Sequence, residues 1–163
     1  MPEIICNTSP LQYLHQSGAL HVLPELVKTI TVPPAVQQEL ETGRRLGMNL
    51  PDLQMLDWVV IRRPSSSVAL PLVTDLGSGE REVLALALET PDSVCILDDL
   101  LARQVARTLQ LRITGTLGIL IDAKRLGIIS AVGPFLDQLQ SFGFRLAPHT
   151  RAAVLNLVSE AEK

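Results

Sequence analysis

Short apolar or β-branched segments recur along this 163-residue chain, and most are followed by a segment with helical periodicity. The clearest is Val94–Leu97, an uninterrupted apolar run, which is typical of a strand buried on both faces. Strands of this kind form parallel sheets that are covered by helices on both sides. The alternation therefore predicts an α/β fold with a central, largely parallel sheet.

The same patterns place the individual elements. Strands are expected at Glu3–Cys6, Ile30–Val32, Trp58–Ile61, Val94–Leu97 and Leu111–Thr114. Helices are expected over Leu11–Leu20, Ala35–Arg45, Glu80–Glu89, Leu100–Leu109, Gly115–Lys124, Ser130–Phe142 and His149–Glu160. Ser65–Ser67 is expected to be a linker or turn. The length suits one domain, 1–163, with a core over about 3–128 and a C-terminal helical extension over 129–163.

Composition argues against several classes of function. Aromatic residues make up only 3% of the chain, which disfavours a base-stacking platform for single-stranded nucleic acid. The net charge of −3 gives no overall basic field. No signal peptide and no apolar run long enough to span a membrane are visible, so we expect a cytoplasmic protein. Cys6 and Cys95 lie within apolar runs and are expected to be buried and reduced.

Polar residues follow two of the expected strands. Asn7-Thr8-Ser9 follows the first strand, and Asp98-Asp99 follows the strand at Val94–Leu97. Ligands of open parallel α/β sheets bind beyond the carboxyl ends of the strands. Further acidic residues near helix starts are Glu39, Glu80 and Glu82. If these groups converge, their oxygen atoms suit one or two hard cations such as Mg²⁺.

Each of these residues also has a simpler interpretation. Glu39 alone would be a solvated helix residue, and Glu80 in a first helical turn would favour the helix dipole. Asp98 or Asp99 would be the N-cap of the following helix, although one cap needs only one aspartate. Asn7 would be only a cap or turn residue.

Basic residues are the candidates for holding a phosphate. Arg81, Arg103 and Arg107 lie on helices that begin at or near the acidic residues, although a solvated surface position suits them equally well. The pairs Arg44-Arg45 and Arg62-Arg63 are expected at the surface. The three histidines are scattered, which gives little support to a histidine-based site.

The chain resembles the PIN-domain superfamily and, within it, a bacterial family of PIN-like proteins. The resemblance implies a three-layer α/β/α PIN-like fold, with a central, mostly parallel sheet of about four or five strands and C-terminal helices. The matching stretches occur in family order across about residues 3–146. They are Asn7–Leu11, Val32-Pro33 with Val36–Leu40, Leu76–Ala87, Leu97–Asp99 with Ala102-Arg103 and Ala106, and Gly115–Leu120 with Ala123-Lys124 and Gly127.

The resemblance also implies an activity and partners. PIN proteins hydrolyse phosphodiesters, commonly in RNA, with Mg²⁺ or Mn²⁺ held by three or four acidic residues. Many are toxins of toxin–antitoxin pairs and many dimerise, so the resemblance implies RNA, an antitoxin protein and a second copy of the chain as partners. No membrane partner is implied.

The family's site residues carry over by position onto this sequence. The metal ligands fall on Asn7, Glu39, Glu80, less strongly Glu82, and Asp98 or Asp99, with Asp99 favoured by spacing. The catalytic acids are Glu39, Glu80, Asp98 and Asp99. Thr8 and Ser9 would contribute hydroxyl groups beside the metal, and Arg81, Arg103 and Arg107 would bind the substrate.

Asn7 departs from the superfamily pattern, which usually has an aspartate at this position. An amide oxygen can bind a hard cation but brings no charge, so the site would bind metal more weakly. The alternative function is therefore a catalytically weak or inactive PIN-like module that binds RNA or a protein partner. A phosphoryl-transfer or receiver-like α/β domain is a more distant alternative, because the chain has no P-loop pattern and its acids lack the receiver spacing.

Overall fold

Five parallel strands form one sheet at the centre of the computed structural model, which describes residues 2–65 and 75–161. Their order across the sheet is β3-β2-β1-β4-β5. The strands are β1 (Glu3–Cys6), β2 (Ile30–Val32), β3 (Val59–Ile61), β4 (Ser93–Ile96) and β5 (Arg112–Thr114). The prediction of an α/β fold with a parallel sheet is confirmed.

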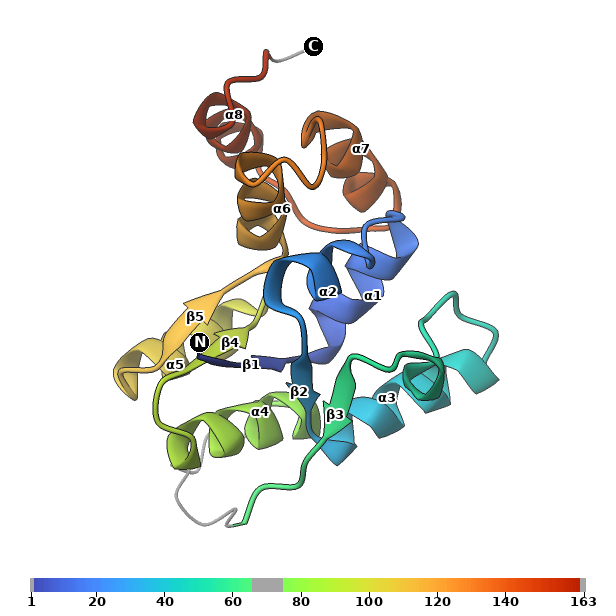
Figure 1. Cartoon of the computed structure of the whole chain (residues 1–163), viewed down its shortest axis with the longest axis vertical. Helices are drawn as coiled ribbons and strands as arrows, with labels where there is room; N and C mark the ends of the chain where they lie inside the picture. Colours follow the sequence, from blue (N-terminus) through green and yellow to red (C-terminus); the bar gives the residue numbers. More distant parts are fainter. Residues whose placement is uncertain (1, 66–74, 162–163) are drawn as a thin grey trace.

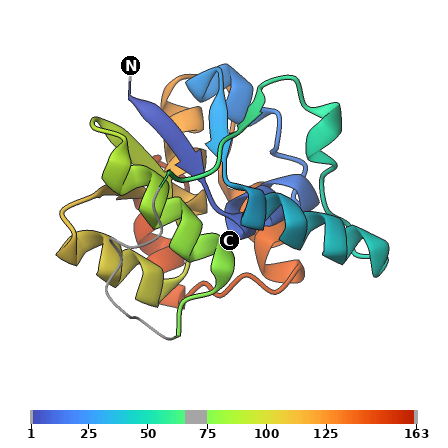
Figure 2. The same ribbon diagram turned by 90° about the horizontal axis from the view of Figure 1, so that it is seen from below.

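Helices cover both faces of this sheet, which makes the expected three layers (Figures 1 and 2). In Figure 1, α3, α4 and α5 lie on one side, and α1, α2 and α6 lie on the other, with α7 and α8 packed farther out. The helices in the described part of the chain are α1 (Thr8–Gln16), α2 (Val22–Val27), α3 (Pro34–Arg45), α4 (Ser78–Glu89), α5 (Leu100–Thr108), α6 (Thr116–Arg125), α7 (Gly133–Ser141) and α8 (Pro148–Leu157). A short 3-10 turn, Leu53–Met55, precedes β3.

The first predicted helix is wrong in its extent. The pattern predicted a helix over Leu11–Leu20, whereas α1 spans Thr8–Gln16, because Gly18 adopts φ +79°, a left-handed conformation that ends the helix. Helix α2, Val22–Val27, was not predicted. The apolar residues Val22 and Leu23 then form the fully buried face of α2. Most other boundaries shift by one to three residues. Of the expected linker, Ser66 and Ser67 lie outside the described residues.

The central strands β1 and β4 carry the core. Ile5, Cys6, Cys95 and Ile96 have no exposed surface, whereas Val60 on the edge strand β3 is 51% exposed. Ile5 is the register partner of Cys95, so Cys6 and Cys95 point to opposite faces of the sheet and cannot form a disulfide. Burial raises the pKa of the Cys95 thiol to about 12, which keeps this group protonated. Both cysteines are free and buried, as expected.

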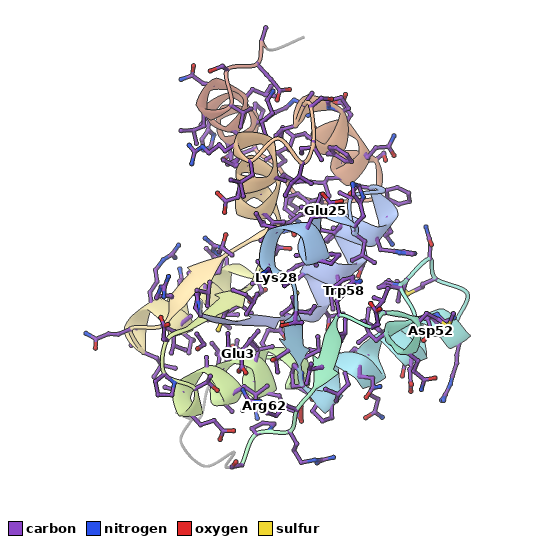
Figure 3. All side chains as sticks on the ribbon, in the orientation of Figure 1. Glu3, Glu25, Lys28, Asp52, Trp58 and Arg62 are labelled. Carbon is purple, nitrogen blue, oxygen red and sulfur yellow. The ribbon has the colours of Figure 1, made fainter. Side chains whose placement is uncertain are left out.

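One arginine of the expected surface pairs has a structural role instead. Arg62, which follows β3, forms an ion pair with Glu3 at the start of β1 (both labelled in Figure 3). The same guanidinium group donates to the Thr90 hydroxyl at 3.0 Å and lies 3.7 Å from Glu89. Arg62 therefore connects the edge strand, the central strand and the end of α4.

The C-terminal helices are held by a carboxylate. Glu160 accepts hydrogen bonds from the amides of Val132 and Gly133, at 2.7 and 2.9 Å, at the start of α7. Its second interaction is an ion pair of 3.0 Å with Lys124 on α6. We call Glu160 and these three partners the C-terminal clasp. No helix in the described part of the chain has the length and apolar character needed to cross a bilayer.

We predict that Glu160→Gln lowers the free energy of unfolding by about 1 kcal/mol at neutral pH, because the charged acceptor at the start of α7 is lost. Burial acts to raise the pKa of Glu160, but the amides of the C-terminal clasp and Lys124 lower it below its ordinary value of 4.5. A depressed carboxyl pKa stabilises the fold above that ordinary value, and the contribution disappears as the pH falls through the folded-state pKa. Urea unfolding of the variant at neutral and acidic pH measures this difference.

The control is Asp57→Asn, which neutralises an exposed carboxylate in the turn before β3 and should leave unfolding unchanged at either pH. If Glu160→Gln lowered the free energy of unfolding by the same amount at acidic and at neutral pH, the charge of Glu160 would not be what stabilises the C-terminal clasp.

Candidate functional site

The direction in which successive strands are added to the sheet reverses between its two central strands, β1 and β4. From β1 the chain continues to β2 on one side, and from β4 it continues to β5 on the other. The chain therefore leaves the carboxyl ends of β1 and β4 in opposite directions, which is the place where open α/β sheets bind ligands. Asn7 follows β1 here and donates its backbone N–H to the carbonyl of Ile96 at 3.1 Å.

Asn7 is the most unusual residue at this point. It is 2% exposed, and its side-chain oxygen Oδ1 is buried with no hydrogen-bond partner. Asn7 occupies the N-cap position of α1, yet its side chain makes no capping bond. A buried polar atom without a partner costs free energy, so an oxygen kept in this state favours a missing ligand.

Glu39 brings a carboxylate from α3 to the same place. The Thr8 hydroxyl donates to its Oε2 at 2.5 Å, and the backbone N–H of Gly79 donates to its Oε1 at 2.9 Å. A methyl group on Gly79 would lie 2.7 Å from Glu39 Oε1 and 3.1 Å from Asn7 Oδ1. The amide oxygen and the carboxylate therefore border the same small space, which stays open because residue 79 is a glycine.

Glu80 lies within electrostatic reach of both Glu39 and Asp99. Burial raises the pKa of Glu80, its own backbone N–H lowers it, and repulsion from Glu39 and Asp99 raises it further. The carboxylate of Glu80 folds back over the first turn of α4, close to Gly77. Asp99 is exposed and caps α5 by accepting the N–H of Ala102 at 2.9 Å.

Asp98 is held separately from this group. Its two oxygen atoms accept the backbone N–H and the hydroxyl of Thr116, at 2.8 and 2.6 Å, at the start of α6. Burial raises the pKa of Asp98, while the bonds from Thr116 and the charge of Arg103 lower it. The two aspartates therefore serve two helices: Asp99 caps α5 and Asp98 caps α6.

The structure gives the remaining candidates different positions. Glu82 accepts the N–H of Ala35 at 2.9 Å and so caps α3, which gives it a structural partner. Arg103 donates to the carbonyl of Leu97 at 2.8 Å, beside Asp98. Arg107 and Arg81 are exposed, and Ser9 is half-buried in the first turn of α1. Burial lowers the pKa of the Arg103 guanidinium, and the nearby charge of Arg107 lowers it further.

Two residues of the site were missed from the sequence. Gly79 contributes only a backbone N–H and a lack of side chain. Gly79 and Thr116 both lie in stretches that carried the family resemblance, but neither was named as a site residue. The rule that selected Asn7 and Asp98, polar residues just after a strand, would have selected Thr116 if applied to β5.

These donors are hard oxygen atoms, which suit Mg²⁺ or Mn²⁺. Within the described ranges, no three acidic, histidine or cysteine side chains lie close enough together to hold a metal ion. The arrangement is therefore one buried amide oxygen with a neighbouring carboxylate, surrounded by further acids that interact electrostatically. Bound waters and substrate oxygens would have to complete a coordination shell.

Comparison with protein families gave one result. A family model described as a PIN domain matches residues 3–160, which includes all the candidate residues above and the C-terminal helices. The comparisons with curated proteins and with solved structures gave no significant match.

We predict that Glu80→Gln stabilises the protein at neutral pH. A carboxyl group with a raised pKa opposes folding once the pH exceeds its ordinary value of 4.5, because the folded state holds the proton more tightly. Glutamine removes the charge and keeps an acceptor for the backbone N–H. Thermal unfolding should therefore show a gain in midpoint at neutral pH and no gain in acid. Asp57→Asn, at an exposed position, is the control, and a loss of stability in Glu80→Gln at neutral pH would contradict the prediction.

Proposed function

The chain belongs to a PIN-domain family, and from this premise we propose that it is a ribonuclease that hydrolyses RNA with the help of Mg²⁺ or Mn²⁺. PIN domains are commonly nucleases and generally use divalent metals. The observation that carries the proposal is the buried oxygen of Asn7, which has no partner and borders the Glu39 carboxylate. A hard cation would satisfy both groups.

The residues present fit such a cation. The groups that would hold it are Asn7, Glu39, Glu80 and Asp99, with Asp98 as the alternative at the end of β4. Repulsion of Glu80 by Glu39 and by Asp99 would be relieved by a positive charge, which supports a cation near Glu80. Mg²⁺ usually keeps several waters and needs few protein ligands, so a loose set of side chains is compatible with it.

The chain's own residues orient these donors before a substrate binds. Thr8 and Gly79 fix the two oxygen atoms of Glu39, and Thr116 fixes those of Asp98. Burial and the neighbouring acids raise the pKa of Glu80, which makes it a candidate to take up a proton during the reaction. When bound, the cation supplies charge that offsets the phosphate and acidifies a water molecule.

Substrate phosphates would meet the basic residues of α5. Arg103 is engaged with the Leu97 carbonyl beside Asp98, so it supports the end of β4. Arg107 is exposed one helical turn farther along and is therefore the better placed of the two to contact RNA. Arg81, exposed on α4, is a second candidate for this contact.

We predict that a mixed RNA pool is cleaved in the presence of Mn²⁺, and that Glu39→Gln, Glu80→Gln and Asp99→Asn each lower the rate by about 100-fold or more. Each substitution removes one charge and keeps the shape of the side chain. Glu41→Gln, two residues farther along α3, is the matched control and should cleave like the wild type. Equal activity in all the variants would contradict the assignment of the acids.

We predict that Asn7→Asp raises the affinity for Mn²⁺, because it adds a fourth charge where the neutral amide stands. Without metal the same variant should be less stable than the wild type, since the new carboxylate is buried close to Glu39. Calorimetric titration with Mn²⁺ and thermal unfolding with and without it measure the two effects. If neither changed, Asn7 would not belong to the site.

A second candidate is a PIN-like module that binds RNA or a protein partner without cleaving RNA. Two observations favour it: Asn7 is neutral, and no three acidic, histidine or cysteine side chains are grouped closely enough among the described residues to hold a metal ion. RNA binding without cleavage, unchanged by Asn7→Asp, would support this candidate over the nuclease.

Four further points stay predictions. They are the role as a toxin, the antitoxin partner, the homodimer and the cytoplasmic location. Growth arrest of a bacterial host on expression of the wild type, relieved by Glu39→Gln, would support the toxin role.

A further inference from the structure

A groove with both polar and apolar lining runs along one face of α3 and passes Glu39. Its volume is about 520 Å³, and its lining on α3 is Ala35, Gln38, Glu39, Thr42 and Gly43. Leu46, the first residue after α3, and Ser78 at the start of α4 complete it. Figure 2 shows α3 and α4 on the same side of the sheet, so the groove passes the place where the acidic residues lie.

The chemistry of this groove differs from that of a phosphate track. Apart from Glu39, its polar side chains are uncharged: an amide from Gln38 and hydroxyl groups from Thr42 and Ser78. None of its lining residues is basic, so a phosphate there would meet only the negative charge of Glu39. Amide and hydroxyl groups match the edges of nucleobases and the 2′-hydroxyl of ribose instead.

The far end of the groove is apolar. The side chain of Leu46 is 77% exposed, as are several other large apolar side chains at helix ends in this structure. A methyl group on Gly43 would collide with Leu50, so this glycine lets the loop after α3 fold back against the helix. An ion pair of 3.3 Å between Arg44 and Asp52 (labelled in Figure 3) fixes that loop. Leu46 is thereby presented next to the groove as a surface for the face of a base.

The length of the groove limits what it accepts. From Glu39 to Leu46 the helix rises by about 10 Å, and stacked bases are about 3.4 Å apart. The part of the groove between Glu39 and Leu46 therefore has room for about three nucleotides. Their base edges must be free of pairing to reach Gln38 and Thr42.

We propose that this groove binds the unpaired nucleotides next to the phosphodiester that is cut, and that Gln38 and Thr42 determine which base is accepted there. The inference rests on the proposed ribonuclease function and adds the basis of sequence preference. Leu46 covers the face of the base, and the adjoining phosphate lies with Glu39 and its neighbours. The groove contributes specificity, whereas the acidic residues contribute the chemistry.

The test is to sequence the ends produced from a random RNA pool by the wild type and by Gln38→Ala, Thr42→Val and Leu46→Ala. Gln38, Thr42 and Leu46 are exposed, so the variants should fold, which thermal unfolding checks. We expect the base preference next to the cut to change by about fivefold or more in Gln38→Ala and Thr42→Val, as the loss of one hydrogen bond predicts. Leu46→Ala should raise KM for every base with little effect on kcat.

The matched control is Gln37→Ala, the neighbouring glutamine, which faces a different groove beside Leu53 and should keep the wild-type preference. An unchanged base preference in both Gln38→Ala and Thr42→Val would overturn the inference. Absence of cleavage by the wild type would instead count against the proposed function. In that case the inference is tested by binding: the affinities of the wild type and of Gln38→Ala for short A, C, G and U oligonucleotides are measured with Ca²⁺. A base preference of the wild type that is lost in Gln38→Ala would support the inference. Equal affinity of the wild type for all four oligonucleotides would overturn it.

Discussion

All five strands of the sheet point the same way, and this single constraint explains where the acidic residues lie. In a parallel sheet every strand is followed by a segment that begins at the same edge, so the helices after the strands also start there. Each helix start carries N–H groups without partners and a positive partial charge. The carboxyl edge of this sheet is therefore rich in unsatisfied donors, and it attracts carboxylates before any ligand is considered.

Acidic side chains accept the free N–H groups at most of these helix starts. Asp99 caps α5, Asp98 caps α6 and Glu82 caps α3. At the start of α4, Gly79 donates to Glu39, and Glu80 accepts its own backbone N–H. Helix α1 is the exception, because the side chain of Asn7 stands at its N-cap position and makes no such bond. These carboxylates thus have hydrogen-bond partners within the protein, whereas the side-chain oxygen of Asn7 has none.

The sequence contained enough information for the fold but only part of the site. Fully apolar strands and helical periodicity predicted the parallel sheet, because a strand that is buried on both faces has apolar residues at successive positions. The end of α1 before Gly18 was missed, because the sequence alone does not show whether a glycine adopts a positive φ angle. Which partner each acid binds could not be predicted either. Glu39 and Gly79 are forty residues apart, and only the packing of α3 on α4 brings them together.

The C-terminal clasp has a consequence for how the chain folds as it is synthesised. The amides of Val132 and Gly133 leave the ribosome well before Glu160, which follows Gly133 by 27 residues. Until then the start of α7 has no acceptor from this carboxylate, while all five strands and the acidic residues beside them have already been made. In a nascent chain the segments of the sheet are therefore available to fold before the C-terminal clasp can close, and the clasp can form only as a later step.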